Sequence, residues 1–118
     1  MFSIVKTFKK ARVGKLFLKH GVVDTPVFMP VATMGTIKSI TFEDLLDFNT
    51  QIILSNTYHI FLRPGLDVIK KFQGLHNFIQ WHKPILTDSG GFQIFSLAKL
   101  NKVNEDGVLF QSHIDGTQ

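Results

Sequence analysis

Apolar and polar positions alternate at two different periods along this chain, and their order predicts a mixed α/β fold. Residues 2–26, FSIVKTFKKARVGKLFLKHGVVDTP, combine short alternating runs with a turn at His20 and Gly21, which is typical of an antiparallel hairpin. Residues 25–33, TPVFMPVAT, are almost all apolar and include two prolines. This run predicts a short strand that is covered on both faces.

A helix and a second strand follow. Thr41 precedes Asp44 by three residues, and an apolar run comes directly behind them. This pattern predicts a helix whose first turn carries acids near its positive end. Residues 50–59, TQIILSNTYH, predict a second buried strand that continues directly into polar residues.

The next segments complete the order strand, helix, strand, helix, strand. Residues 64–81, PGLDVIKKFQGLHNFIQW, predict a helix that begins at Pro64 and ends near Gly74, with a shorter helix after it. Residues 83–91, KPILTDSGG, predict a third strand. Elements in this order form parallel βα units joined by right-handed crossovers. Behind them the runs FQIFSL and GVLFQSHIDG predict short strands, with a turn at EDG, residues 105–107.

Each predicted parallel strand ends in small or polar residues. In parallel sheets and barrels that edge binds ligands, because helix N-termini and loops converge there. We therefore expect candidate site residues at the three strand ends, which are Ala32, Thr33 and Gly35 after the first, Ser55, Asn56, Thr57, Tyr58 and His59 after the second, and Asp88, Ser89, Gly90 and Gly91 after the third.

Asp88 is the candidate with the most chemistry. A carboxylate at this edge can accept a hydrogen bond from a ring N–H, attack as a nucleophile, or act as a general acid and base. The alternative is structural: Asp88 or Ser89 closes the N-terminus of the next element, and Gly90 and Gly91 form a plain turn. In a binding site the same glycines would let a ligand approach the backbone closely and would present N–H groups to it.

The NTYH segment offers further hydrogen-bonding groups. The Asn56 amide, the Tyr58 phenol and the His59 imidazole suit a sugar or a base, although a lone Tyr or His is more often structural. Arg63, directly before a proline, either binds phosphate or pairs with an acid.

Three further residues were weighed as ligands or contacts. His113 and Asp115 in SHIDG are too few for a metal site, so a β-turn at Asp115 and Gly116 is the better interpretation and no metal site is predicted. Lys38 is either a surface charge or an interface contact.

Composition narrows the classes of function. The 118 residues contain no cysteine, which excludes a disulfide framework and thiolate chemistry. The apolar runs are far shorter than the ~20 residues of a membrane-spanning helix, so we expect a cytoplasmic protein. A formal charge of +4 would attract a polyanion, although a solvated basic surface without a partner explains the charge equally well.

Five sequence blocks in order carry a resemblance to a known family. TPVFMPVATMGTIK, LSNTYHIFLRPG, GLHNFIQW, LTDSGGFQIFSL and GVLFQSHIDG resemble the N-terminal part of the tRNA-guanine transglycosylases, the queuine tRNA-ribosyltransferase family. The blocks span nearly all of the chain from about residue 11 onward. The resemblance implies a TIM (β/α)8 barrel preceded by a small antiparallel sheet, of which residues 1–118 supply about the first three βα units of an incomplete barrel.

The resemblance also implies an activity, which is exchange of guanine at the tRNA wobble position for queuine or its precursor 7-aminomethyl-7-deazaguanine. In that family the aspartate matching Asp88 contacts the purine and shuttles a proton, while Ser89, Gly90 and Gly91 belong to the base pocket. Phe92 would cover one face of the flipped base. Asn56, Tyr58 and His59 match residues on the ribose side of the pocket. Lys38 matches a lysine at a homodimer interface, although we expect no normal homodimer from residues 1–118 alone.

Two parts of the family pattern match nothing in this chain. They are a second aspartate, which is the covalent nucleophile, and the three cysteines and one histidine that hold a structural zinc. We therefore expect the 118-residue chain to bind no cofactor, to expose apolar surface at open strand edges, and to be marginally stable and inactive alone.

Three interpretations of the chain remain open. It is part of an active transglycosylase, or a non-catalytic module that binds tRNA or a partner, or a decayed gene fragment. Without the resemblance, the runner-up is a generic α/β phosphate binder built on DSGG, which lacks a Walker-type lysine and the dinucleotide glycine spacing.

Overall fold

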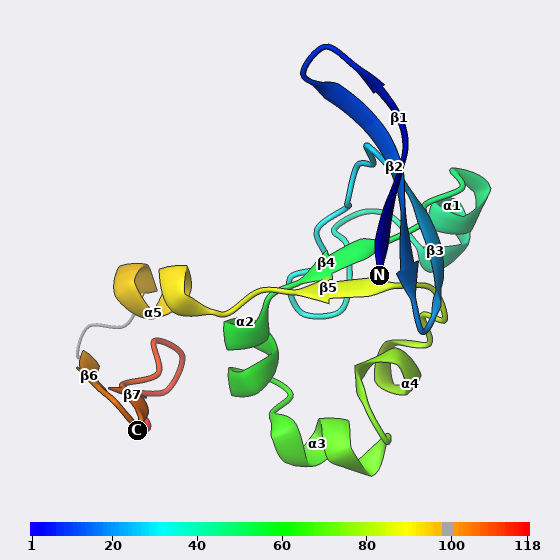
Figure 1. The fold of residues 1–118 in the computed structure, drawn as a ribbon. Coiled ribbons are helices and arrows are strands. Elements are labelled where there is room, and N and C mark those ends of the chain that lie inside the picture. The colour runs from blue at the N-terminus through cyan, green and yellow to red at the C-terminus, as the bar shows by residue number, and fades with distance from the viewer. Residues whose placement is uncertain (98–100) are drawn as a thin grey trace.

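An antiparallel sheet of three strands forms the N-terminal part of the fold. The computed structural model describes residues 1–97 and 101–118 (Figure 1). Strands β1 (Phe2–Phe8), β2 (Ala11–Leu18) and β3 (Gly21–Thr25) pair in sequence order, with β2 in the centre and a register shift in β1 between Ile4 and Lys6. The predicted antiparallel hairpin is confirmed and gains a third strand. Its β1–β2 tip points away from the remaining elements (Figure 1).

Two short parallel strands lie at the centre of the molecule. Strands β4 (Ile53–Ser55) and β5 (Ile85–Thr87) pair in parallel, with Ile53 opposite Ile85 and Ser55 opposite Thr87, which confirms both predicted strands and their direction (Figure 1). Only β4 is well buried, because β5 is partly exposed along its length.

The predicted strand at residues 25–33 is reduced to a single parallel bridge between Val31 and Leu54, so that prediction is wrong in extent. The Leu54 N–H donates to the Pro30 carbonyl (2.9 Å), and the Ala32 N–H donates to the Leu54 carbonyl (2.7 Å). The prolines in this run have no N–H to extend the ladder. The run is also not covered on both faces, since the Phe28 side chain is 82% exposed.

Helix α1 (Phe42–Asp47) begins as predicted, with a reciprocal cap. The Asp44 N–H donates to the Thr41 hydroxyl (3.1 Å), and the Thr41 N–H donates to the Asp44 carboxylate (2.8 Å). These hydrogen bonds from the Thr41 backbone and side chain lower the pKa of Asp44 below its usual value. Helices α3 (Leu66–Lys71) and α4 (Leu75–Ile79) confirm the two predicted helical segments, although α3 begins two residues after Pro64 and ends three residues before Gly74.

Two helices were not predicted. Helix α2 (Thr57–Leu62) follows β4 directly, where the sequence indicated only polar residues after a strand. Helix α5 (Gly91–Leu97) occupies FQIFSL, which was predicted as β structure, so that prediction is wrong. An apolar run this short fits both the helical period of 3.6 residues and the strand period of two, and its aromatic residues favoured a strand. The predicted turn at residues 105–107 is confirmed as the connection of hairpin β6 (Asn101–Asn104) and β7 (Gly107–Phe110).

The core is small and lies between the parallel strands, α1 and α4. It consists of Ala32, Leu45, Ile53, Ile79 and Trp81. The Trp81 indole N–H donates to the Pro84 carbonyl (3.1 Å), so burial of this ring leaves no unpaired donor. The radius of gyration is 16.9 Å, whereas a compact chain of this length has about 13.5 Å. The expected exposure of apolar surface is confirmed, and it includes Leu86 on β5.

Two stacked imidazoles connect the antiparallel sheet to α4. The rings of His20, in the β2–β3 turn, and His76 lie 3.6 Å apart with an interplanar angle of 12°. The Nε2 atom of His76 is buried and has no hydrogen-bond partner among the described residues. Burial, followed by the nearby charges of His20 and His82, lowers the pKa of His76, which is therefore neutral in the folded protein near neutral pH.

Gly35 is a position where a side chain would not fit, and it yields a test of the core. Its φ is +78°, and an added Cβ would lie 2.5 Å from the Ile79 Cγ2 atom. We expect Gly35→Ala to lower the free energy of unfolding by about 2 kcal/mol or more. Thermal and urea unfolding measure the loss. The double variant Gly35→Ala, Ile79→Ala should lose less stability than the sum of the two single variants, because the clash with Ile79 is removed. If the losses in free energy of unfolding add fully, the contact with Ile79 does not cause the loss in Gly35→Ala.

The neutral His76 makes stability depend on pH. The unfolded chain takes up a proton near the ordinary pKa of 6.5, while the folded chain does so at a lower pH, so stability present above pH 6.5 is lost as pH falls below it. We expect His76→Phe, which keeps a ring against His20 and removes the titrating group, to flatten the fall in melting temperature between about pH 7 and pH 5. Asn77→Gln, which changes an exposed side chain on α4 and removes no titrating group, is the matched control and should keep the wild-type pH dependence. Equal pH dependence in wild type and His76→Phe would contradict this assignment.

Candidate active site

Asp88 follows β5 directly and is bound by the residues that follow β4. Its carboxylate accepts hydrogen bonds from the Asn56 side-chain amide and from the Thr57 N–H, the latter at 2.9 Å. The Thr57 hydroxyl donates to the Asp88 carbonyl. Asp88 is half-buried, so its carboxylate lies at the edge of the parallel strands and not in the core. The expected position of Asp88 at the carboxyl end of the strand is confirmed.

The Asp88 carboxylate also closes two backbone segments. It accepts from the first N–H of α2 and from the Gly90 N–H (3.2 Å), which precedes α5. The N-cap residue of α2, Asn56, makes no side-chain cap of its own, so Asp88 supplies the cap from a remote position. The structural role considered for Asp88 is therefore present, and it is directed mainly at α2.

The glycine pair forms a tight turn that packs on α2. Gly90 is buried with φ of +74°, and an added Cβ would lie 3.3 Å from the Tyr58 backbone nitrogen. The Gly91 N–H donates to the hydroxyl of Ser89 (3.4 Å), which is itself exposed. Gly90 therefore requires the absence of a side chain for two reasons, its backbone conformation and its close approach to Tyr58.

The NTYH side chains separate into two groups. Asn56 faces Asp88, whereas Tyr58 is 2% exposed and its hydroxyl lies 2.8 Å from the Nδ1 atom of His113. The rings of Tyr58 and His113 stack with centroids 5.5 Å apart, and the ring of His59 meets Tyr58 edge-on at 5.4 Å. Tyr58 and His59 thus join α2 to the C-terminal turn.

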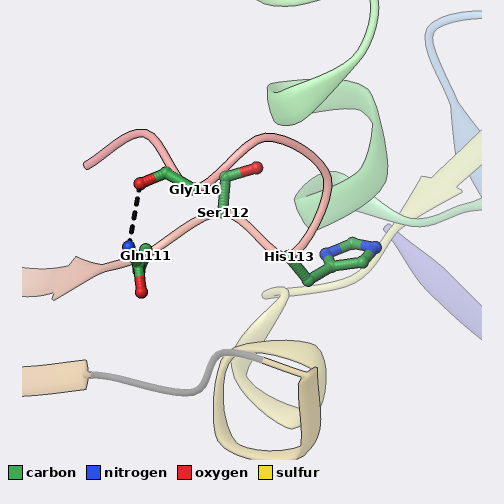
Figure 2. Close-up of a pocket in the computed structure, with 4 residues that line it drawn as sticks. All are labelled: Gln111, Ser112, His113 and Gly116. Atoms are coloured by element: carbon green, nitrogen blue, oxygen red, sulfur yellow. Dashed lines mark hydrogen bonds between the residues drawn. The ribbon is translucent and has the colours of Figure 1, made fainter.

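A turn is present near the predicted position, but its hydrogen bond spans four residues from Ser112 to Gly116, as in an α-turn, and not three as in the predicted β-turn. The Gly116 N–H donates to the Ser112 carbonyl (3.0 Å), and hydrogen bonds from the Ser112 and Thr117 side chains hold the pKa of Asp115 below its usual value. A cavity of about 260 Å³ lies inside the turn and is lined by Gln111, Ser112, His113 and Gly116 (Figure 2). Figure 2 shows the His113 ring directed away from the Gln111 and Gly116 hydrogen bond, toward α2.

The remaining candidates lie outside this hydrogen-bonded group. Phe92 is 78% exposed on α5, and Arg63 is exposed at the end of α2. Lys38 is exposed and lines a separate cavity of about 380 Å³ together with Val31 and Met34. The structure therefore brings Asp88, Asn56, Ser89 and Gly90 together and places Phe92, Arg63 and Lys38 on open surface.

The sequence located three further residues without assigning them the contacts that they make around the site. Thr57 holds Asp88 through its N–H and hydroxyl, and His113 holds Tyr58. Ser55 is fully buried at the end of β4, and its hydroxyl has no partner among the described residues. Its sequence signal was a hydroxyl at the last position of an apolar strand, directly before Asn56.

The residues present do not fit a zinc site of the family type. The sequence has no cysteine, and within residues 1–97 and 101–118 no three His, Asp or Glu side chains come together as metal ligands. In the same described ranges, no helix has the length and apolar character needed to cross a membrane.

Comparison with known proteins covers almost the whole chain. A relative from Acinetobacter baumannii, named queuine tRNA-ribosyltransferase, is 61% identical over 109 residues, which are 92% of this chain and 29% of the relative. Relatives of the same name from Desulfosudis oleivorans and Ruminiclostridium cellulolyticum are 59% and 54% identical and cover 92% and 99% of this chain. The chain spans about three tenths of the length of these relatives.

The family model described as queuine tRNA-ribosyltransferase matches residues 7–118. This range includes every element from β2 onward and all of the residues around Asp88. Together with the identity to the relatives, the match establishes that the chain belongs to the queuine tRNA-ribosyltransferase family.

Proposed function

We propose that this chain forms the purine-binding part of an enzyme that exchanges guanine in tRNA for queuine or its precursor 7-aminomethyl-7-deazaguanine. The observation that carries the proposal is the half-buried Asp88 carboxylate, bound to Asn56 and Thr57 at the carboxyl ends of two parallel strands. Family membership supports it, since the matched relatives are named for this activity.

The parallel strands agree with the first part of a (β/α)8 barrel. In this proposal the Val31 bridge, β4 and β5 are three neighbouring barrel strands, in that order, preceded by the antiparallel sheet. Residues 1–118 are then the N-terminal portion of one barrel domain. A typical barrel needs ~250 residues, which agrees with the longer relatives.

Asp88 is the residue that we assign to proton transfer. Expulsion of a purine from ribose is easier when a positioned acid protonates the base as it leaves, and the incoming base loses a proton in return. A single carboxylate serves both steps if it contacts the base. Among the described residues, the Asp88 carboxylate accepts from the Asn56 amide and from two backbone N–H groups, so the N–H of a purine would be a donor of the same kind.

The residues around Asp88 receive supporting roles in this proposal. Ser89, Gly90 and Gly91 shape the base pocket, and the exposed ring of Phe92 covers one face of the base after it has left the anticodon stack. Asn56 lies on the ribose side and orients Asp88. Tyr58 and His59 support that side through their contacts with His113.

The proposal includes two further features of the family, a homodimer interface and a second set of functional residues, which lie away from Asp88. Lys38, exposed beside its own cavity, would contribute to a homodimer interface. The structural zinc and the covalent aspartate of the family would be supplied by residues beyond the span that this chain shares with its relatives. We therefore expect the 118-residue polypeptide to show no base exchange by itself.

A chimera tests the assignment of Asp88. We would replace the matching 109 residues of the Acinetobacter baumannii relative with this chain and measure incorporation of labelled guanine into tRNA. We expect the chimera to exchange the base and Asp88→Asn in the chimera to be slower by about 100-fold or more, because a general acid and base is lost. Binding of tRNA to Asp88→Asn should be retained.

The controls make the outcome decisive. Asn77→Asp in the same chimera changes an exposed amide on α4 and should leave exchange unchanged. Circular dichroism verifies that each protein is folded. A folded chimera that binds tRNA without exchange, or an Asp88→Asn chimera that keeps the parent rate, contradicts the proposal.

The contact between Asn56 and Asp88 has a separate test by unfolding. Asn56→Asp places two carboxylates at hydrogen-bond distance, so we expect a loss of about 1–3 kcal/mol in the free energy of unfolding. Adding Asp88→Asn restores one amide facing one carboxylate and should recover most of that loss. Asn77→Asp again controls for the added charge. Absence of recovery in the double variant would show that the two side chains are not direct partners.

A further inference from the structure

The N-terminal sheet carries positive charge that the site around Asp88 does not use. Residues 1–23 contain no Asp or Glu and six Lys and Arg residues, so their side chains have a formal charge of +6 against +4 for the whole chain. All six basic side chains are exposed. They are Lys6, Lys9, Lys10, Arg12, Lys15 and Lys19.

Five of these six cations form no ion pair in the described part of the chain. The Nζ atom of Lys15 lies 2.6 Å from the Asp24 carboxylate, and this is the one ion pair within residues 1–97 and 101–118. The other five therefore keep their full attraction for an anion. Salt screens such charges, so any binding they support must weaken as ionic strength rises.

One aromatic ring accompanies the cations at the end of the hairpin. We call this end the hairpin tip and define it as Lys6, Phe8, Lys9, Lys10 and Arg12. Phe8 is 72% exposed, and the Lys9 Nζ atom lies 5.7 Å from its ring centroid. A hollow of about 200 Å³ is lined by Lys6, Phe8, Arg12 and apolar neighbours. Figure 1 shows that this end of the β1–β2 hairpin extends away from the rest of the molecule.

We propose that the hairpin tip binds the phosphate backbone of RNA, with the Phe8 ring available to stack on an unpaired base. Clustered Lys and Arg side chains release condensed counterions when they bind phosphates, and exposed aromatic rings stack on bases of any sequence. The identity of the RNA as tRNA rests on the proposed function. The binding chemistry rests on the charge and the exposed ring.

An anionic membrane is the competing partner for a basic and apolar surface, and the strand register disfavours it. Lys6 lies opposite Val13, on the same face of the sheet as Phe8 and the Lys15–Asp24 pair. Charged groups therefore interrupt that apolar face. A surface that inserts into lipid keeps its apolar and charged residues on separate faces.

The test is titration of the 118-residue chain with labelled tRNA at salt concentrations from about 50 to 200 mM. The tip variant combines Lys9→Gln, Lys10→Gln and Arg12→Gln. The matched control removes the same charge elsewhere, through Lys70→Gln, Lys71→Gln and Lys102→Gln, at exposed positions on α3 and β6. Because both variants lose three positive charges, a general effect of net charge affects them equally.

We expect the slope of log K against log salt to become shallower by about 3 in the tip variant, with affinity lower by about tenfold or more, and by less than about 1 in the control. A variant with Lys9→Arg and Lys10→Arg should bind as the wild type does, which shows that charge and not folding is responsible. Phe8→Leu should weaken binding about fivefold or more without changing the slope.

Four results would overturn the inference: a wild-type chain that does not bind tRNA, a tip variant with the wild-type slope, a control variant that loses as much as the tip variant, or preferential binding to anionic lipid vesicles. Wild-type affinity of Phe8→Leu would overturn the stacking role of Phe8. Base exchange is not part of any readout. A chimera that fails to exchange guanine therefore leaves this test intact, and loss of the salt slope leaves the Asp88 assignment intact.

Discussion

The rest of the structure around the site depends on the hydrogen bonds of one carboxylate. Strands β4 and β5 pair over only three residues each, and α2 starts directly behind β4 without a side-chain cap of its own. Asp88 closes this arrangement from β5, because it binds the Asn56 amide and the first N–H of α2. The same carboxylate therefore fixes the geometry of two strand ends and remains half-exposed to a ligand. The structural role of Asp88 is therefore compatible with the proton transfer that we propose for it.

Some elements are stabilised by residues that are close in sequence, and these were predictable. Elements that depend on residues far away along the chain were not. The cap of α1 involves Thr41 and Asp44, three residues apart, and the sequence located it correctly. The cap of α2 comes from Asp88, which is 31 residues from Thr57, so no window along the chain contains both partners. Aromatic and β-branched residues in α2 also favour a strand. The helix forms because its buried residues Tyr58 and Ile60 are packed in the tertiary structure.

The candidate site shows the same division. The contact between Asp88 and Asn56 was predictable, because neighbouring parallel strands have their carboxyl ends at the same edge of the sheet. This rule requires only the order of the strands along the chain. The position of Tyr58 did not follow, because its partner His113 lies 55 residues away and belongs to a turn after a separate hairpin. Ser55 shows a third case, since its identity is visible in the sequence while the lack of a partner for its buried hydroxyl is a property of the packing alone.

The two proposals assign different tasks to the hairpin tip and to Asp88 in binding an RNA. Phosphate contacts fix the position of a nucleic acid without reading its bases, whereas contacts to a base decide which base reacts. The tip offers cations and one exposed ring, while the Asp88 region offers directional acceptors and a glycine turn with little charge. The tip belongs to the antiparallel sheet and Asp88 follows a parallel strand, so different elements make the two proposed contacts. Binding strength would then depend on ionic strength through the hairpin, and the choice of base would depend on hydrogen bonds at the strand ends.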